Sequence, residues 1–229
     1  MQTLMIANTI TYVLEATIKP GLVAVMMEVI HDSGCKRASF VASGEKFTVM
    51  AAMPDNSVLF NGSIPAHVSR PGGFTLTEGE FNLMRSPSMA NASITYDGAE
   101  QAHLSYRGRN SWAWAVPFKG TRHSARKLLN KHDADAVINV DKMVDELGEQ
   151  KDKEEVCLEI SQGRITVNGI DVGGGANGKA VGRYKWRFIA CMINRCQHAT
   201  NMALHMENHG ALTLLCTEEI MFGTRIFHV

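Results

Sequence analysis

Hydrophobic residues along the chain fall mostly in short runs bounded by turn residues, which predicts many short β-strands and few short helices. In the first half, apolar residues recur at helical spacing between Leu22 and Ile30, and Pro20 before them and Gly34 after them predict a helix over 21–33. Thr77 and Glu80 predict a capping box for a short helix over 78–85. Strands are predicted at 38–42, 46–53, 58–60, 74–76, 92–96, 102–106 and 112–116, with a loop at 66–73.

The second half shows the same kind of pattern. Asp141 is predicted to cap a helix over 141–148 that ends at Gly148, and a second helix is predicted over 189–198. A glycine-rich loop is predicted at 173–178. Strands are predicted at 137–140, 156–160, 165–170, 183–188, 202–206, 211–216 and 222–227.

The two halves repeat one order of elements: strand, helix, further strands with a loop, a short helix, then three strands. This order predicts an α+β fold made of two similar domains, each with two short helices packed on antiparallel sheets. The predicted boundaries are 1–117 for the first domain, 118–135 for a connector and 136–229 for the second domain.

Charge is neutral in total but uneven along the chain. The 229 residues contain 23 basic and 23 acidic side chains, so the protein does not bind nucleic acid by being basic throughout. Lys119–Lys131 and Lys179–Arg195 hold basic residues and no acidic ones, whereas Asp141–Glu155 is mostly acidic. Two interpretations stay open: ordinary surface variation, or a side that faces phosphates and an opposite acidic side.

The compartment follows from the cysteines and from the N-terminal region. Five cysteines without a CxxC pair predict free thiols in a reducing environment. Residues 1–10 contain no Lys or Arg, so a secretory signal is not expected, and the run 22–27 is too short for a membrane helix. The expected location is therefore the cytoplasm.

Motifs for catalysis or cofactor binding are weak. Residues 173–180 read GGGANGKA, which resembles a phosphate-binding loop, but Ala180 replaces the Ser or Thr and a strand is predicted to follow. A flexible hairpin loop is the favoured interpretation. His205 and His209 do not match a zinc motif, and Cys191 and Cys196 have no metal-binding spacing. The chain is therefore predicted not to be an enzyme and to bind no cofactor and no metal.

Two segments are strongly β-prone and are expected to flank their sheets: 112–116 and 183–188. Unprotected sheet edges pair readily with another chain. Contact between subunits and burial within one domain both remain open for these segments.

The doubled layout resembles the DNA sliding clamps, the processivity factors of replicative polymerases, in their two-domain class of PCNA-like and tailed-phage clamps. The second half carries most of this resemblance, through AVINVDKMVDELG, EEVCLEISQGRITVNGI and NMALHMENHGALTLLCTEE. In the first half it is carried by KPGLVAVMMEVIHDSG and GFTLTEGEFNLMRSP.

The resemblance implies a ring of six such domains, hence a homotrimer, with helices lining a hole around duplex DNA of any sequence. It implies a DNA polymerase and a clamp loader as partners, and no membrane. It also implies association with the nucleoid in a bacterial host, or location in the nucleus in a eukaryotic host. The residues implied to face DNA are Lys19, Arg85, Lys142 and Arg195. The residues implied at the subunit interface are Trp112, Trp114 and Val116 on one edge and Tyr184 and Trp186 on the other. The implied pocket for a partner peptide is formed by Phe118, Leu128, Ile226 and Phe227.

Other functions remain open from sequence alone. A monomeric viral processivity factor of related fold would hold DNA by charge. A β-rich viral structural or assembly protein would have no clamp activity. A small hydrolase or nucleotide-binding enzyme would depend on the glycine loop and Lys179.

Overall fold

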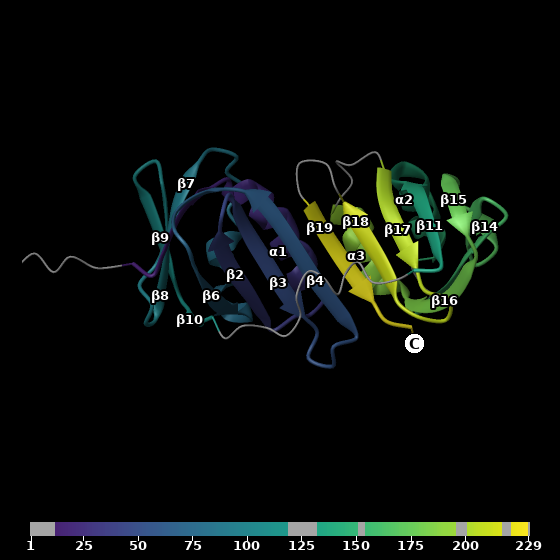
Figure 1. The fold of residues 1–229 in the computed structure, drawn as a ribbon, viewed down its shortest axis with the longest axis horizontal. Coiled ribbons are helices and arrows are strands. Elements are labelled where there is room, and N and C mark those ends of the chain that lie inside the picture. The colour runs from purple at the N-terminus through teal and green to yellow at the C-terminus, as the bar shows by residue number, and fades with distance from the viewer. Residues whose placement is uncertain (1–11, 119–131, 151–153, 196–200, 217–220, 229) are drawn as a thin grey trace, which may run out of the picture.

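The first half of the chain forms a long series of antiparallel strands around one α-helix and one short 3-10 helix (Figure 1). The structure is a computed structural model that describes residues 12–118, 132–150, 154–195, 201–216 and 221–228. The elements of the first half are β1 (Leu14–Ile18), α1 (Pro20–Asp32), β2 (Arg37–Ser43), β3 (Lys46–Ala52), β4 (Val58–Pro65), β5 (His67–Arg70), β6 (Gly72–Thr77), η1 (Glu78–Met84), β7 (Ala92–Tyr96), β8 (Gln101–Tyr106), β9 (Arg109–Trp114) and β10 (Val116–Pro117).

The second half repeats this series with two α-helices. Its elements are β11 (Ala134–Asn139), α2 (Val140–Gln150), β12 (Glu155–Ser161), β13 (Arg164–Val167), β14 (Ile170–Asp171), β15 (Gly175–Gly178), β16 (Ala180–Lys185), α3 (Trp186–Arg195), β17 (Asn201–Met206), β18 (Leu212–Cys216) and β19 (Met221–Ile226). β11 begins at Ala134, so the second series starts inside the range 118–135 that the sequence assigns to a connector.

Strand pairing shows that the two halves are the same structural unit. In the first half, β1 pairs with β5 and β7, and β2 pairs with β3 and β6. In the second half, β11 pairs with β15 and β17, and β12 pairs with β13 and β16. Each half then ends in an antiparallel meander, β7-β8-β9 or β17-β18-β19. The α+β fold of two similar domains is therefore confirmed, and β9 and β14 are the counterparts of β19 and β4.

One sheet runs through both halves. The last strand, β19, pairs with β4 of the first half from Met221 opposite Ser63 to Ile226 opposite Val58. This pairing joins the two halves into a central sheet with the order β10-β6-β2-β3-β4-β19-β18-β17-β11-β15 (Figure 1). The two smaller sheets, β5-β1-β7-β8-β9 and β14-β13-β12-β16, lie toward opposite ends of the molecule (Figure 1).

The helices cover one face of the central sheet near the junction. Gly62 on β4 lies against the Met26 side chain of α1 and the Phe222 ring of β19. The hydroxyl of Thr224 on β19 donates a hydrogen bond to the Met192 sulfur of α3, 3.4 Å away. α1 and α3 therefore lie side by side across the boundary between the halves, and both bury apolar side chains against it.

The ends of α1 follow from its sequence. Pro20 occupies the first turn, where its missing N–H costs no hydrogen bond, and the apolar spacing buries most of the helix. Gly34 has a φ of 82°, a conformation that glycine adopts without strain, so the chain turns away there. The predicted helix over 21–33 is confirmed within one residue at each end.

Several local predictions are wrong. Residues 66–73 contain β5 and the start of β6, and β15 occupies part of the predicted glycine loop, because backbone pairing needs no particular side chain.

The predicted helix ends differ from the observed ones. Thr77 makes no side-chain capping bond. The Asn139 side chain, not Asp141, accepts the Lys142 N–H at 3.0 Å, and α2 continues to Gln150. α3 begins at Trp186, three residues before the predicted start at 189, and is described as far as Arg195, so the predicted end at 198 lies outside the described residues. None of the helices in the described ranges is long and apolar enough to cross a lipid bilayer.

Candidate functional site

The edge strand β9 exposes two tryptophans at one end of the molecule. Trp112 and Trp114 are 62% and 52% exposed, whereas Ala113 between them is 2% exposed and faces the core. The two indole rings meet edge to face with their centroids 6.3 Å apart. Val116, just beyond the strand, is also exposed. Large apolar side chains that stay exposed on an edge strand are typical of a protein contact.

The backbone of β9 also faces outward at these positions. The Ala115 N–H donates to the Glu100 carbonyl oxygen, 2.7 Å away, so Ala115 faces β8. Because backbone groups alternate in direction along a strand, those of Trp112 and Trp114 face away from β8. The Glu80 carboxylate accepts the Trp114 N–H at 3.3 Å, which covers one end of the edge.

At the opposite end, the smaller sheet of the second half has two edges, β14 and β16. The sequence placed the second interface residues on the β16 edge. Tyr184 and Trp186 are both buried in their own domain, and the Tyr184 hydroxyl donates to the Gly210 carbonyl at 3.0 Å. Burial raises the pKa of the Tyr184 phenol, so it stays neutral. Neither side chain can offer surface to a neighbouring subunit, and the strand predicted to reach Phe188 ends at Lys185.

The correspondence between the two halves indicates β14, not β16, as the edge strand that is available for a contact with another subunit. β16 corresponds to β6, whose outer edge is covered by β10 in the first half. β14 corresponds to β4, and β4 is the strand that accepts β19 inside the chain. β19 is buried along most of its length because it is paired on both sides, whereas its counterpart β9 is exposed. Among the described strands, β9 and β14 each have one edge without a partner strand, and they are the counterparts of β19 and β4, which pair with each other inside the chain.

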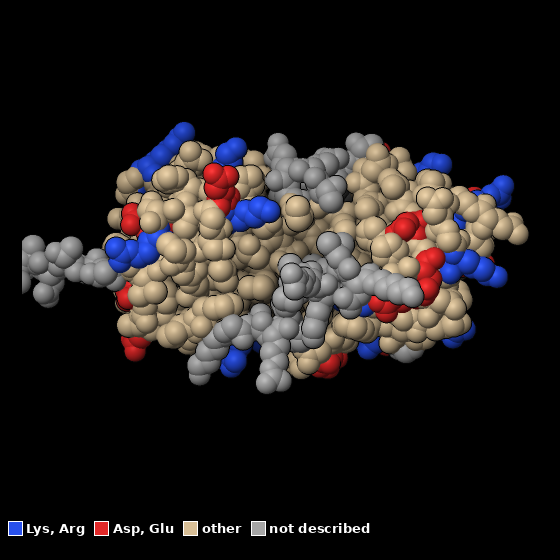
Figure 2. Space-filling model, in the orientation of Figure 1, with Lys and Arg blue, Asp and Glu red and all other residues tan. Residues whose placement is uncertain are grey.

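The helices carry more acidic than basic residues. The predicted acidic block from Asp141 onward forms α2, and α1 and η1 add further Asp and Glu residues. Of the side chains predicted to face DNA, Lys19 and Lys142 are exposed and Arg85 is half-buried. The described helical surface is therefore not strongly basic. On the face drawn in Figure 2, basic and acidic side chains are interspersed toward both ends of the molecule.

Arg195, the fourth predicted DNA contact, is bound to carboxylates of the first half. Its guanidinium lies 2.8 Å from Asp32 and 2.9 Å from Glu28, both on α1. Burial alone would raise the pKa of Asp32, but hydrogen bonds from Arg195 and His31 lower it below its ordinary value. The same bond to Asp32 raises the pKa of Arg195. Its positive charge is thus balanced within the chain.

A groove of about 420 Å³ lies beside the start of the predicted connector. It is lined by Arg37, Ser39, Met50, Ala51, Ala52, Phe60, Thr75, Thr77, Val116 and Pro117. Of the predicted pocket residues, Phe118 is half-buried, Phe227 is partly exposed and Ile226 is buried in the core. Ile226 therefore cannot contribute surface to a pocket, and Leu128 lies outside the described residues.

The glycine-rich segment does not have the architecture of a phosphate-binding loop. Gly175–Gly178 forms β15, which pairs with β11, and the strand β16 follows. A phosphate-binding loop opens a helix, whose N-terminal amides hold the phosphates. This segment therefore serves strand pairing.

Comparison with known proteins identifies the fold. The chain matches no family model, and no curated protein matches its sequence. Solved structures of DNA sliding clamps share its architecture. Proliferating cellular nuclear antigen from Entamoeba histolytica superposes with a TM-score of 0.73 at 8% identity, covering 96% of this chain and 100% of that one. PCNA of A. fulgidus, bound to the C-terminal region of FEN-1, gives 0.73 at 10% identity, covering 94% and 98%.

A bacterial clamp matches over part of its length. The DNA polymerase III beta subunit from Thermotoga maritima gives a TM-score of 0.76 at 10% identity, covering 96% of this chain and 66% of that chain. The chain has the fold of the sliding clamps, as its sequence pattern predicts. Its length agrees with the PCNA chains, because these are covered almost completely.

Proposed function

We propose that the chain is the subunit of a ring-shaped, non-enzymatic DNA sliding clamp. In this proposal β9 of one subunit pairs with β14 of the next, in the way that β19 pairs with β4 inside the chain. The contact is head-to-tail, and such a contact closes a ring when the rotation from one subunit to the next returns to the first subunit. Two domains per chain and six domains per ring make the assembly a homotrimer. Trp112 and Trp114 would then be covered at each junction.

The observation that carries this proposal is the contrast between β9 and β19. The two strands hold the same place in the two repeats, yet β19 is paired on both sides, whereas the outer edge of β9 has no partner strand among the described residues. The free edge bears the exposed tryptophans and outward-facing backbone groups. A partner that supplies a strand like β4 would satisfy these groups, and β14 is the counterpart that the chain itself offers.

Retention on DNA would depend on topology more than on charge. The helices that would line the hole have few basic side chains, and Arg195 is engaged by Asp32 and Glu28. Binding to phosphates through few cations is weak and independent of sequence. A closed ring needs no strong contact to stay on DNA, and weak contacts let it slide.

Partner proteins would bind on the outer side. The groove beside Pro117 combines apolar side chains such as Met50 and Phe60 with polar groups at its rim. A short partner peptide of a polymerase or clamp loader is the proposed occupant. The A. fulgidus clamp with the FEN-1 region bound supports this kind of partner.

Oligomeric state is the first test. Light scattering on the full chain should give a mass three times 25.1 kDa, and electron micrographs should show a ring with a hole. Trp112→Pro removes an outward N–H while keeping the bonds to β8, so it should shift the protein toward monomer. Trp112→Val keeps that N–H and should remain more trimeric than Trp112→Pro. A parent protein that stays monomeric at high concentration would overturn the ring.

DNA retention is the second test. Linear duplex with open ends is incubated with the protein, the ends are then blocked with a bulky protein, and the sample is washed in high salt. A ring should stay only on DNA that is blocked after incubation, and should be lost from open DNA and absent from DNA blocked beforehand. Binding that is sensitive to salt but does not depend on whether the DNA ends are blocked would indicate a monomeric processivity factor that is held on DNA by charge. A ring that is not retained on any of these DNAs would indicate the alternative function, a viral structural or assembly protein.

A further inference from the structure

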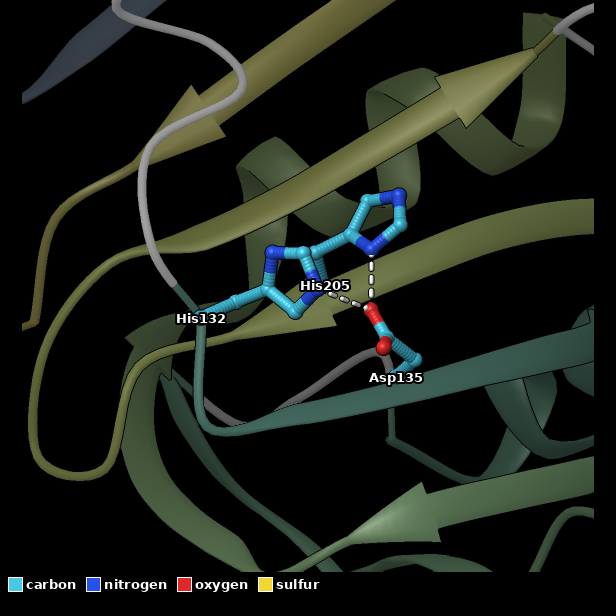
Figure 3. Close-up of side chains that lie close together, drawn as sticks. All are labelled: His132, Asp135 and His205. Atoms are coloured by element: carbon cyan, nitrogen blue, oxygen red, sulfur yellow. Dashed lines mark hydrogen bonds and ion pairs between the residues drawn. The ribbon is translucent and has the colours of Figure 1, made fainter.

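Two histidines and an aspartate meet on the central sheet of the second half (Figure 3). Asp135 on β11 and His205 on β17 are directly opposite one another in the strand ladder. His132 lies just before β11 and reaches back over the same carboxylate. Ala134 and Ala136 are buried in the core, so Asp135 between them faces away from the core and from the helices.

The backbone around this cluster is held firmly. The Asp133 N–H donates to the Met206 carbonyl oxygen at 2.8 Å, and the Asn208 N–H donates to the Asp133 carboxylate at 2.9 Å. These bonds extend the β11–β17 ladder and fix the residue next to His132. The three side chains therefore project from backbone that is hydrogen-bonded within the sheet.

The donor atoms converge closely. Nε2 of His132 lies 2.8 Å from Oδ1 of Asp135, and Nδ1 of His205 contacts the same oxygen. All three donor atoms lie within 4.8 Å of one another. Zinc binds nitrogen and oxygen ligands at about 2.0–2.2 Å, which places neighbouring donors of a tetrahedral site roughly 3.3–3.6 Å apart. Small side-chain rotations would open the cluster to that size.

We propose that His132, Asp135 and His205 form a binding site for one Zn²⁺ ion. Two imidazoles and a carboxylate are a donor set that suits zinc, whereas Mg²⁺ and Ca²⁺ prefer oxygen ligands alone. All three side chains are partly exposed, so an ion can enter and water can complete the coordination. The bound ion would tie the start of β11 to β17, at the point where the chain enters the second half.

Zinc binding is tested on the full chain after treatment with EDTA and desalting. Calorimetric titration with ZnCl₂ should show one ion per chain, and added zinc should raise the melting temperature, because the ion binds the folded form. Asp135→Asn and His205→Gln should each lower the affinity at least tenfold. His67→Gln, an exposed histidine on β5, is the matched control and should leave the affinity unchanged.

Cobalt distinguishes this site from cysteine ligands. Co²⁺ should give the visible bands of a site with nitrogen and oxygen ligands and no thiolate charge-transfer band. A strong thiolate band would assign the metal to cysteines such as Cys157 or Cys191 and overturn the proposal. Failure of the parent to bind zinc, or equal binding by the Asp135→Asn/His205→Gln double variant, would also overturn it. These readouts do not depend on ring formation or on DNA.

Discussion

The guanidinium of Arg195 donates two hydrogen bonds to one carboxylate oxygen of Asp32, at 3.2 Å from Nε and 2.8 Å from Nη2. Arg195 is the last described residue of α3 in the second half, and Asp32 ends α1 in the first. The pair, with Glu28 alongside, therefore links the two halves on the helical side, as β4 and β19 link them in the sheet. A side chain expected to contact DNA instead contributes to the domain junction.

Arg195→Gln should lower the free energy of unfolding by about 0.2–1 kcal/mol at neutral pH, because the pair is partly exposed. The folded-state pKa of Asp32 is lowered, so its contribution is present above the unfolded-state pKa of about 3.9 and is lost as pH falls through the folded value. The difference between parent and variant in urea unfolding should thus shrink from pH 7 toward pH 3.

The control for this variant is Arg187→Gln on the same helix, where the guanidinium lies 4.6 Å from the Phe188 ring. Its effect should not change over the same pH interval. An Arg195→Gln effect that is equally large at pH 3 would contradict a role for the Asp32 carboxylate.

Gly62 allows close packing where the two halves meet. A Cβ at this position would contact the Met26 sulfur and lie 2.6 Å from Cδ2 of Phe222. Gly62→Ala should therefore destabilise the protein by about 1–3 kcal/mol, as overpacking of a filled core does. Chemical unfolding followed by circular dichroism measures the change.

Gly79 offers the matched comparison, since nothing lies within 4 Å of the place that a Cβ would occupy there. Gly79→Ala should be neutral or stabilise by up to about 1 kcal/mol. Equal losses in the two variants would mean that close packing at the junction is not the cause.

Tyr184 has a structural role inside the second half. Tyr184→Phe removes the hydroxyl that donates to the Gly210 carbonyl and should cost about 0.5–1.5 kcal/mol in unfolding free energy. Because burial raises the pKa of the phenol, the parent's advantage over this variant should decline as pH rises above about 10, where the unfolded chain ionises. Light scattering should show the same oligomeric state in both proteins. If the Tyr184→Phe variant lost its oligomeric state, the prediction that Tyr184 lies at the subunit interface would be supported instead.

The sequence predicts the repeated fold well because periodicity marks the buried faces. Two of the strands missing from the prediction, β5 and β15, are the same element of the repeat, the strand that pairs with the first strand of each half. β5 carries His67 and Arg70, and β15 reads GANG, so neither has an apolar pattern. Their backbone groups pair all the same, and hydrophobic patterning does not report that pairing.

The candidate sites divide in the same way. Trp112 and Trp114 could be predicted because a β-prone aromatic segment is visible in the sequence. The role of β14 could not be predicted, since β14 has only two residues. Only its correspondence to β4 in the structure indicates a subunit contact. Asp135 and His205 become neighbours through strand pairing between distant segments, so no spacing of residues in the sequence predicts the cluster.

The pairing of β4 with β19 also constrains the order in which the protein folds. β4 belongs to the first half, but the strand that covers its edge is the last one in the described chain. During synthesis the first half would emerge with that edge open until β19 has followed, and contacts between such distant segments form slowly. An open strand edge is prone to pair with other chains. The junction that unites the finished molecule is therefore also the place where a nascent chain is most exposed to misassembly.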